Sequence, residues 1–467
     1  MGYFAKSGTL RSLQYSLNMA IKNTLSKPPA LPKVRSSLII IVACLVVRLL
    51  LHCLYFPKYE GPDEPFHLAR SVSMANSSLA QGWKGEEFSA ELAADVSREP
   101  CGPDLQRVFG CSSFGEGGIS PQRTQSLKMG AITNYEAHQP PLWYAALAVP
   151  LKVLQAVLGS HHERSSFTAE LLVARLFSVV LVCVGLWCLR RFVASLGLAG
   201  GGLFLVFLSL PGFSESVARA ANDSAVFLAS SVVVMMIVSP GRGAVASGAV
   251  SFAGILVKLT SVPAVALLGL RNLAHSRFSS VLAGGVGVAL AIGAQWLRSY
   301  SWGGTVELNQ ANAQALAISG DAIFGIFRSA AVAVKTAVWL GGWSGFRPPT
   351  WVLVLVLLNA LALAISLKVS KGELRRKAPE ILCLLVAAMG FVVFAWNHRK
   401  LFGIWGGVGG WYFWGWAPWI AWCASELFQW RSELALRAVL VLGTVSSIAI
   451  NISWCVEAAK TYHRFSL

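Results

Sequence analysis

Residues 37–56 read SLIIIVACLVVRLLLHCLYF, and residues 57–70 continue as PKYEGPDEPFHLAR. The first stretch is long enough to cross a bilayer as a helix, which takes about 20 apolar residues. No small-residue cleavage site follows it, so we expect a membrane anchor rather than a cleaved signal peptide. The second stretch is abruptly polar and opens a long acidic segment.

The composition extends this interpretation to the whole chain. Of its 467 residues 55% are apolar and only 13% are charged, against roughly 25% charged residues in ordinary soluble proteins. A water-soluble fold is therefore excluded. The apolar runs are continuous rather than alternating, which favours membrane-spanning helices over a β-barrel. The net charge of +17 comes from Lys and Arg at the ends of these runs, so it indicates membrane orientation and not nucleic-acid binding.

The charge distribution predicts which segments face which side. Residues 1–36 carry six basic residues and no acidic one, so we expect a cytoplasmic N-terminus followed by the first span, 37–56. Residues 57–139 hold 11 of the 22 acidic residues and should form a large extracytoplasmic loop that contains the function. This loop also holds Cys101 and Cys111, a disulfide candidate in an oxidising compartment, although spacing alone does not establish the pairing.

We expect an all-α polytopic membrane protein with about 11 transmembrane helices, within a range of roughly 9 to 13. After the loop we predict a transmembrane core over 140–298, an outer loop with an interfacial helix over 299–349, and C-terminal helices over 350–467. The segments 140–158 and 324–345 are read as interfacial helices, because counting them as crossings damages the charge bias elsewhere. The expected spans are 37–56, 169–189, 195–213, 223–239, 244–257, 260–270, 279–298, 350–367, 380–396, 411–428 and 434–453. The pair 244–270, broken around Lys258 and Pro263, is short for two crossings, and one kinked helix is the alternative.

This topology places four polar stretches on the outer face, where one cavity would collect them. They are 57–139, 215–223, 299–321 and 397–410.

Two neighbouring carboxylates, Asp63 and Glu64, head a predicted helix that contains His67. Asp63 suits the N-cap and Pro65 the first turn, so a capped helix lying on the membrane explains the pattern. The alternative is that Asp63 and Glu64 act as base or metal ligands at the edge of a low-dielectric cavity.

The second polar motif, NYEAHQPPLWY over 134–144, ends the acidic loop. Its double proline fixes an extended entry that holds Glu136 and His138 where they could face Asp63. An interfacial anchor formed by Trp143 and Tyr144 explains the aromatic residues but not the Glu-x-His.

These two motifs resemble bacterial members of the GT-C glycosyltransferase superfamily, in particular its multi-pass branch with a Pro-Asp-Glu motif. The resemblance covers roughly residues 40–260, including RAAND at 219–223. It implies transfer of a sugar from a polyprenyl-phosphate donor to a lipid, glycan or protein acceptor outside the cytoplasm, in a bacterial inner (plasma) membrane. It maps the family's catalytic carboxylate onto Asp63 and a second acid onto Asp223. Related chains often carry Gly-Arg-Tyr where this chain has Gly410-Trp411-Tyr412, which leaves donor-phosphate recognition there open.

Such a transfer needs one base and fixed positive charge or a divalent cation (Mg or Mn) near the departing phosphate. Lys258 interrupts an apolar stretch, where an ionisable group is expensive and functional by default, although snorkelling to the interface is the alternative. Arg219 and Asp223 have the i,i+4 spacing of a simple ion pair. Arg48 and Arg175, inside predicted spans, should pair internally or reach lipid headgroups. Further substrate-binding candidates are His67, Tyr135, Gln139, Arg347, His398, Trp411 and Tyr412, the last two in a Gly/Trp-rich stretch that is also typical of a membrane-interface belt.

Two other functional classes remain open. A non-catalytic transporter or flippase of lipid-linked glycans should place ionisable residues near mid-membrane. A structural membrane subunit predicts that Asp63 and His138 are freely replaceable. Besides the sugar donor and acceptor, the expected partners are membrane lipids.

Overall fold

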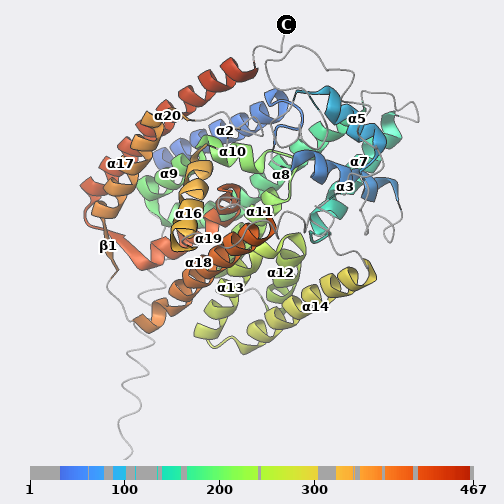
Figure 1. The fold of residues 1–467 in the computed structure, drawn as a ribbon. Coiled ribbons are helices and arrows are strands. Elements are labelled where there is room, and N and C mark those ends of the chain that lie inside the picture. The colour runs from blue at the N-terminus through green and yellow to red at the C-terminus, as the bar shows by residue number, and fades with distance from the viewer. Residues whose placement is uncertain are drawn as a thin grey trace, which may run out of the picture.

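The structure, a computed structural model, describes residues 32–61, 63–77, 88–100, 111, 134, 139–158, 166–239, 243–302, 322–339, 341, 348–370, 374–402 and 409–462. Nearly every element in these residues is a helix (Figure 1). The elements are α2 Pro32–Tyr55, α3 Glu64–Asn76, α5 Ala90–Arg98, α7 Leu142–Leu158, α8 Ser166–Ser195, α9 Gly197–Leu208, α10 Pro211–Val217, α11 Asp223–Val238, α12 Ala244–Val257, η2 Leu259–Ser261, α13 Val262–Ala274, α14 Phe278–Trp302, α16 Ala322–Val338, α17 Thr350–Ser366, β1 Leu367–Val369, α18 Leu374–Phe402, α19 Trp411–Leu427, β2 Phe428–Trp430 and α20 Glu433–Tyr462.

Within the described residues, four helices are long and apolar enough to cross a membrane. They lie in α8, α14, α18 and α20, and the bent pair α9–α10 is a fifth candidate. Six shorter apolar helices of 10–17 residues accompany them. The expectation of a helical membrane protein is confirmed at this level, whereas the count of eleven crossings stays a prediction because the shorter helices do not reach the spanning length.

Two three-residue strands were not anticipated from the sequence. β1 follows α17 directly, β2 follows α19 directly, and the two pair antiparallel with Lys368 opposite Gln429. This short ribbon connects the ends of two helices, so every described element except these six residues is helical, as predicted.

One predicted span is interrupted, and one predicted break between spans is found. The segment 195–213 is not one straight helix, because α9 and α10 meet at an angle of 64° and Pro211 begins the second. The break predicted around Lys258 and Pro263 is present: α12 ends at Val257, Lys258 is extended, and Pro263 lies in the first turn of α13. Irregular backbone at such positions is tolerated in membranes where protein buries it.

The helix α11 lies at the centre of the bundle, packed against α8, α19 and α13 (Figure 1). Small residues permit this close packing. A Cβ at Gly185 of α8 would lie 2.9 Å from the ring of Phe227, and one at Gly415 of α19 would lie 2.7 Å from Val226. The start of α11 is thereby fixed from two sides.

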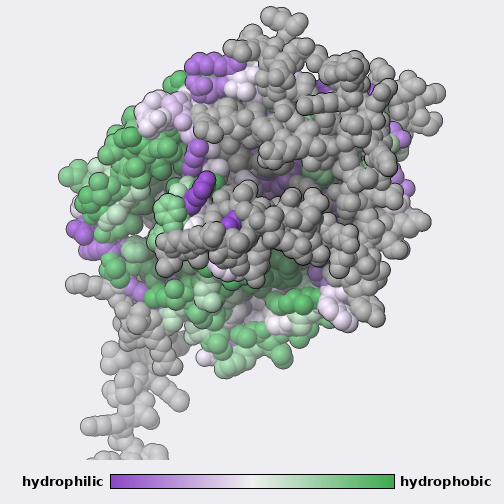
Figure 2. All heavy atoms as spheres, viewed as in Figure 1, coloured by the Kyte–Doolittle hydropathy of each residue, from purple (hydrophilic) through white to green (hydrophobic). Residues whose placement is uncertain are grey.

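Apolar side chains are exposed on the outward helices. Leu282 on α14, Leu357 on α17 and Val441 on α20 are among the most exposed of them. Figure 2 shows these apolar residues gathered over α17 and α20 and over α13 and α14, with hydrophilic residues at both ends of α20. Exposed apolar surface on this scale indicates contact with lipid.

Candidate functional site

Two of the four polar stretches predicted to share the outer face meet in space, and Trp411, the residue directly after a third, lies beside them. Gly61, from the first loop, packs so closely on the turn after α10 that a Cβ there would lie 3.0 Å from Arg219 Cβ. The guanidinium of Arg219 in turn lies 5.6 Å from the ring centroid of Trp411, at the start of α19. The fourth stretch, 299–321, lies largely outside the described residues.

A buried ion pair between Glu64 and Arg175 fixes the first loop in place. Arg175 Nε donates to Glu64 Oε1 at 2.8 Å and Nη2 donates to Oε2 at 2.7 Å. The same guanidinium donates to the carbonyls of Phe56 and Pro57, both at 2.7 Å. The internal pairing expected for Arg175 is therefore found, and it joins α8 to the end of α2 and the start of α3.

The carboxylate of Glu64 has further partners across the site. The backbone N–H of Ala220 donates to Oε1 at 3.0 Å, and that of Gly61 donates to Oε2 at 3.4 Å. Burial alone would raise the pKa of Glu64, but the Arg175 guanidinium and these backbone donors hold the pKa below its ordinary value. Because both oxygens are occupied and the residue is fully buried, this geometry favours a positioning role for Glu64 over the predicted roles of base and metal ligand.

Asp63 occupies the N-cap position but its side chain does not cap the helix. Its backbone is left-handed, with φ 61° and ψ 4°, and it makes no side-chain capping hydrogen bond. The capping explanation for this aspartate is therefore wrong. A non-glycine residue in this region stores strain of about 1–3 kcal/mol, and such residues cluster at functional sites. The carboxylate is only partly buried, on a loop that Glu64 holds rigid.

Asp223, the first residue of α11, lies between two cations. Arg219 Nη2 donates to Oδ2 at 2.5 Å and Lys258 Nζ donates to Oδ1 at 2.8 Å. Lys258 is 5% exposed, so it does not snorkel to an interface but turns inward from the break between α12 and α13. Two cations therefore share one carboxylate in this cluster, Arg219–Asp223–Lys258.

Two predicted aromatic residues cover the cations of this cluster. Lys258 Nζ lies 4.9 Å from the ring centroid of Tyr412. The Arg219 guanidinium lies 5.6 Å from the ring centroid of Trp411. The turn before α19 must be glycine, since a Cβ at Gly410 would lie 1.9 Å from the backbone N of Ala337. The backbone at Gly410 therefore packs directly against α16, and this contact positions both rings.

His67 of α3 is buried against α7 rather than open to a cavity. Its Nδ1 lies 2.7 Å from the hydroxyl of Tyr144, and the two rings stack at 5.7 Å. Trp143 and Tyr144 are 1% and 0% exposed, so the interfacial-anchor interpretation is wrong: they are core residues. Sequence analysis missed this partnership, and it also missed Arg70, whose guanidinium lies 4.0 Å from the Tyr144 ring centroid.

The end of the acidic loop lies against α3. Asn134 is fully buried and its Nδ2 donates to the carbonyl of Phe66 at 2.9 Å, three residues from Asp63. Gln139 is partly buried at the entry to α7. The remaining predicted residues of this motif, Tyr135, Glu136 and His138, lie outside the described residues, as do Arg347 and the side chain of His398.

Two further hydrogen bonds hold the loop before α3 in place, and no sequence pattern predicted them. The hydroxyl of Tyr59 donates to Asp95 Oδ2 of α5 at 2.6 Å, and burial together with Asp95 raises the pKa of the Tyr59 phenol. Glu60 of the same loop is held by α20: the hydroxyl of Tyr462, at the end of that helix, donates to Glu60 Oε2 at 3.0 Å.

The cysteines divide as their positions suggest. Cys111 is buried and disulfide-bonded, whereas its predicted partner, Cys101, lies outside the described residues. Seven cysteines in or beside the helices carry free thiols.

Among the described residues no three His, Cys, Asp or Glu side chains are grouped closely enough to hold a metal ion. The predicted magnesium or manganese site at Asp63 therefore stays a prediction, and it would need a ligand outside the described residues, such as Glu136 or His138.

No family model, curated protein or solved structure matches this chain. The site itself consists of a half-buried carboxylate on a fixed loop, beside a buried cluster of two cations and one carboxylate with two aromatic rings over the cations.

Proposed function

We propose that this protein is a membrane glycosyltransferase of the GT-C type, which moves a sugar from a polyprenyl-phosphate donor to a lipid, glycan or protein acceptor. The observation that carries the proposal is the packing of Gly61 on Arg219, which brings the Asp63 loop against the Arg219–Asp223–Lys258 cluster. A base and a phosphate-binding cation are the two parts that this transfer requires, and they come from distant parts of the chain.

In the proposed reaction the oxygen of the acceptor hydroxyl attacks the anomeric carbon of the donor sugar, and Asp63 accepts the proton of that hydroxyl. The bond between that carbon and the phosphate oxygen breaks on the opposite face, so the configuration inverts. The departing phosphate gains negative charge, which the buried cations Arg219 and Lys258 would stabilise. A divalent cation, where bound, would share this last task.

The proposal includes the membrane arrangement that the charge pattern predicts. The active loop lies outside the cytoplasm of a bacterial plasma membrane, and about eleven helices cross or enter the bilayer. The meeting of 57–61, 215–223 and 409–412 at one place supports a common side for these stretches.

A second candidate, a transporter of lipid-linked glycans, is favoured by one observation. Lys258 and Asp223 form a buried pair where α12 and α13 are interrupted, and interrupted helices with paired charges are typical of substrate sites in transporters.

The test compares wild type, Asp63→Asn and Glu91→Gln in cells that lack the native gene, at matched protein levels. Glu91 is an exposed acid of the same loop and serves as the control. We expect Asp63→Asn alone to remove one sugar from a surface glycan and to accumulate its lipid-linked donor. Unchanged glycans in Asp63→Asn would overturn the assignment of the base.

Purified protein in detergent separates the two candidates, because a micelle has no two sides to transport between. Given a radiolabelled extract of lipid-linked sugars and acceptor lipids, a transferase moves label to the acceptor, and Asp63→Asn does not. A protein that moves no label in detergent but restores glycans in cells is a transporter.

A further inference from the structure

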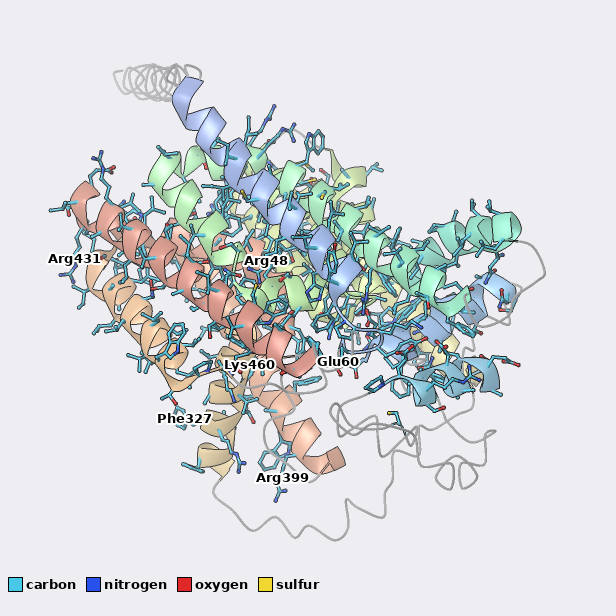
Figure 3. All side chains as sticks on the ribbon, turned by 90° about the horizontal axis from the view of Figure 1, so that it is seen from above. Arg48, Glu60, Phe327, Arg399, Arg431 and Lys460 are labelled. Carbon is cyan, nitrogen blue, oxygen red and sulfur yellow. The ribbon has the colours of Figure 1, made fainter. Side chains whose placement is uncertain are left out.

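A second site of a different kind lies between the first and last long helices. A cavity of about 950 Å³ is bordered by α2 and α20, with Ser214 of α10 at its floor and Lys58 and Glu99 at one end. In Figure 3 the C-terminal halves of α2 and α20 converge toward Glu60 and Lys460, with Arg48 further back between them. The contact between Tyr462 and Glu60 closes that end.

Arg48 provides an unmatched positive charge at this cavity. Its Nε donates to Ser214 Oγ at 3.1 Å and Nη1 donates to the carbonyl of Ser209 at 2.6 Å. No described residue accepts a hydrogen bond from Nη2, and no carboxylate of the described residues lies within ion-pair distance. Glu215 acts on Arg48 only from further away, because its Oε1 accepts from the N–H groups of Gly341 and Trp454.

His52, one helical turn after Arg48, also lines the cavity and is only 6% exposed. Neither of its ring nitrogens has a hydrogen-bond partner among the described residues. Its ring is stacked on Phe56 at 4.2 Å, which fixes its orientation. A buried imidazole without partners is costly, so a ligand that supplies an acceptor and a donor would stabilise it.

The surroundings identify where such a ligand comes from. Leu51 and Tyr55 of α2 and Cys455 of α20 line the cavity and are exposed on the apolar surface. At the other end, Lys58 and Glu99 neutralise each other at 2.8 Å. The cavity is thus open to the bilayer and has apolar and aromatic walls, and Arg48 is the charged lining residue that no other lining residue neutralises.

We propose that this cavity binds an anionic phospholipid of the bilayer, with its phosphate at Arg48 and His52 and its chains beside α2 and α20. A phosphodiester supplies acceptors for Arg48 Nη2 and the imidazole N–H, and a headgroup hydroxyl supplies the donor that the second nitrogen of His52 lacks. The volume is within the range of about 300–1,000 Å³ that ligand pockets occupy. This site is separate from Asp63 and does not depend on the glycosyltransferase proposal.

The lipid also has a place in the architecture. Its phosphate would bridge α2 to the bend between α9 and α10, through Arg48 and Ser214, and that bend leads directly to Arg219. Loss of the lipid should therefore lower the stability of the bundle without removing any residue of the candidate site.

The first test measures lipid binding by native mass spectrometry of the full chain in detergent. We expect phosphatidylglycerol to bind at least about tenfold more tightly than phosphatidylcholine, the difference that one charged hydrogen bond supplies. Arg48→Gln should remove most of this preference, while Arg48→Lys should retain part of it. Equal binding of the two lipids to wild type would overturn the proposal.

Two variants leave the bonds of Arg48 to Ser209 and Ser214 in place and guard against misfolding. His52→Phe keeps the stack on Phe56 but removes the polar ring nitrogens, and Cys455→Trp fills the cavity; both should weaken phosphatidylglycerol binding. Cys44→Trp is the matched control, since Cys44 is an exposed free cysteine of α2 that does not line the cavity. Unaltered binding in Cys455→Trp would place the lipid elsewhere.

Thiol labelling distinguishes a lipid from a free ion. Phosphatidylglycerol should slow the alkylation of Cys455 by a membrane-permeable maleimide and leave that of Cys44 unchanged. Inorganic phosphate alone should protect neither thiol. Protection by inorganic phosphate would show an ion site instead of a lipid site, and equal protection by phosphatidylcholine would show a site without charge recognition.

Discussion

Lys258 Nζ lies 2.8 Å from Asp223 Oδ1, and this contact joins the break between α12 and α13 to the first turn of α11. The two residues are 35 positions apart, and both side chains are buried. Breaking a buried ion pair by removing one partner is far more destabilising than losing an exposed pair. The contact therefore holds the irregular backbone at Lys258 in place, and it holds the Lys258 ammonium group beside Asp223 in the candidate site.

Replacing Lys258 with Met should lower the free energy of unfolding by about 3–5 kcal/mol, because Asp223 keeps only Arg219 as a charged partner. Unfolding by denaturant in detergent micelles measures this. Lys152→Met is the control, since Lys152 is exposed on α7 and its loss should change stability by less than about 0.5 kcal/mol. Similar effects of the two substitutions would show that the buried pair contributes nothing.

Glu64→Gln should destabilise the protein in a pH-dependent way. The folded-state pKa of Glu64 is lowered, so its contribution is present above the unfolded pKa of about 4.3 and is lost as the pH falls through the folded value. Protonated Glu64 and Gln are near-isosteric and both neutral. We therefore expect the stability difference between wild type and Glu64→Gln to be large at neutral pH and to shrink in acid. A difference independent of pH would contradict the ionised state assigned here.

Asp63 should separate stability from activity. Its φ of 61° is strained for a residue with a Cβ, so Asp63→Gly should be more stable than Asp63→Ala by about 1 kcal/mol, while both lose the proposed base. The pair differs only in the Cβ, which removes side-chain contacts from the comparison. Equal stability of the two would mean that the loop adopts a different backbone without the aspartate.

How far the sequence predicted this molecule depends on the range of the interactions. Continuous apolar runs located the helices, and Pro263 and Lys258 marked the break between α12 and α13, because these signals are local. The bend at Pro211 has an equally local cause. The apolar residues on both sides of it nevertheless predict one continuous span over 195–213. The pair Glu64–Arg175 spans 111 positions, and no periodicity reports such a partner.

The candidate site shows the same division. Residue type, position and the family resemblance indicate Arg219, Asp223, Lys258, Trp411 and Tyr412, and the structure brings all five together. The roles within the first motif were less predictable. Asp63 has the residue type of a cap but the backbone of a strained turn, and Trp143 has the residue type of an interfacial anchor but the burial of a core residue.

The bonded state of Cys111 makes the predicted link to Cys101 directly testable. Digestion of unreduced protein should yield a cross-linked peptide that contains both residues, and reduction should separate it. A loop of this length contributes up to about 3 kcal/mol by constraining the unfolded chain, so reduction should also lower stability. Alkylation of both thiols in unreduced protein would refute the pairing.

Gly410→Ala should displace the two aromatic rings from their cations. A Cβ at this position would lie 1.9 Å from the backbone N of Ala337 and 2.5 Å from the carbonyl O of Ala333, so α16 or the start of α19 must move. That movement would carry Trp411 and Tyr412 away from Arg219 and Lys258, and Gly410 would lose its hydrogen bond to Thr336 Oγ1. We expect a loss of stability of about 1–3 kcal/mol, as for other overpacked sites.

Gly390→Ala on α18 is the matched control, because nothing lies within 4 Å of the added Cβ. Helix propensity there favours Ala by up to about 1 kcal/mol. If Gly410→Ala were as stable as Gly390→Ala, the approach of α16 to α19 would be looser than the structure describes, and the seating of the rings over the cluster would fall with it.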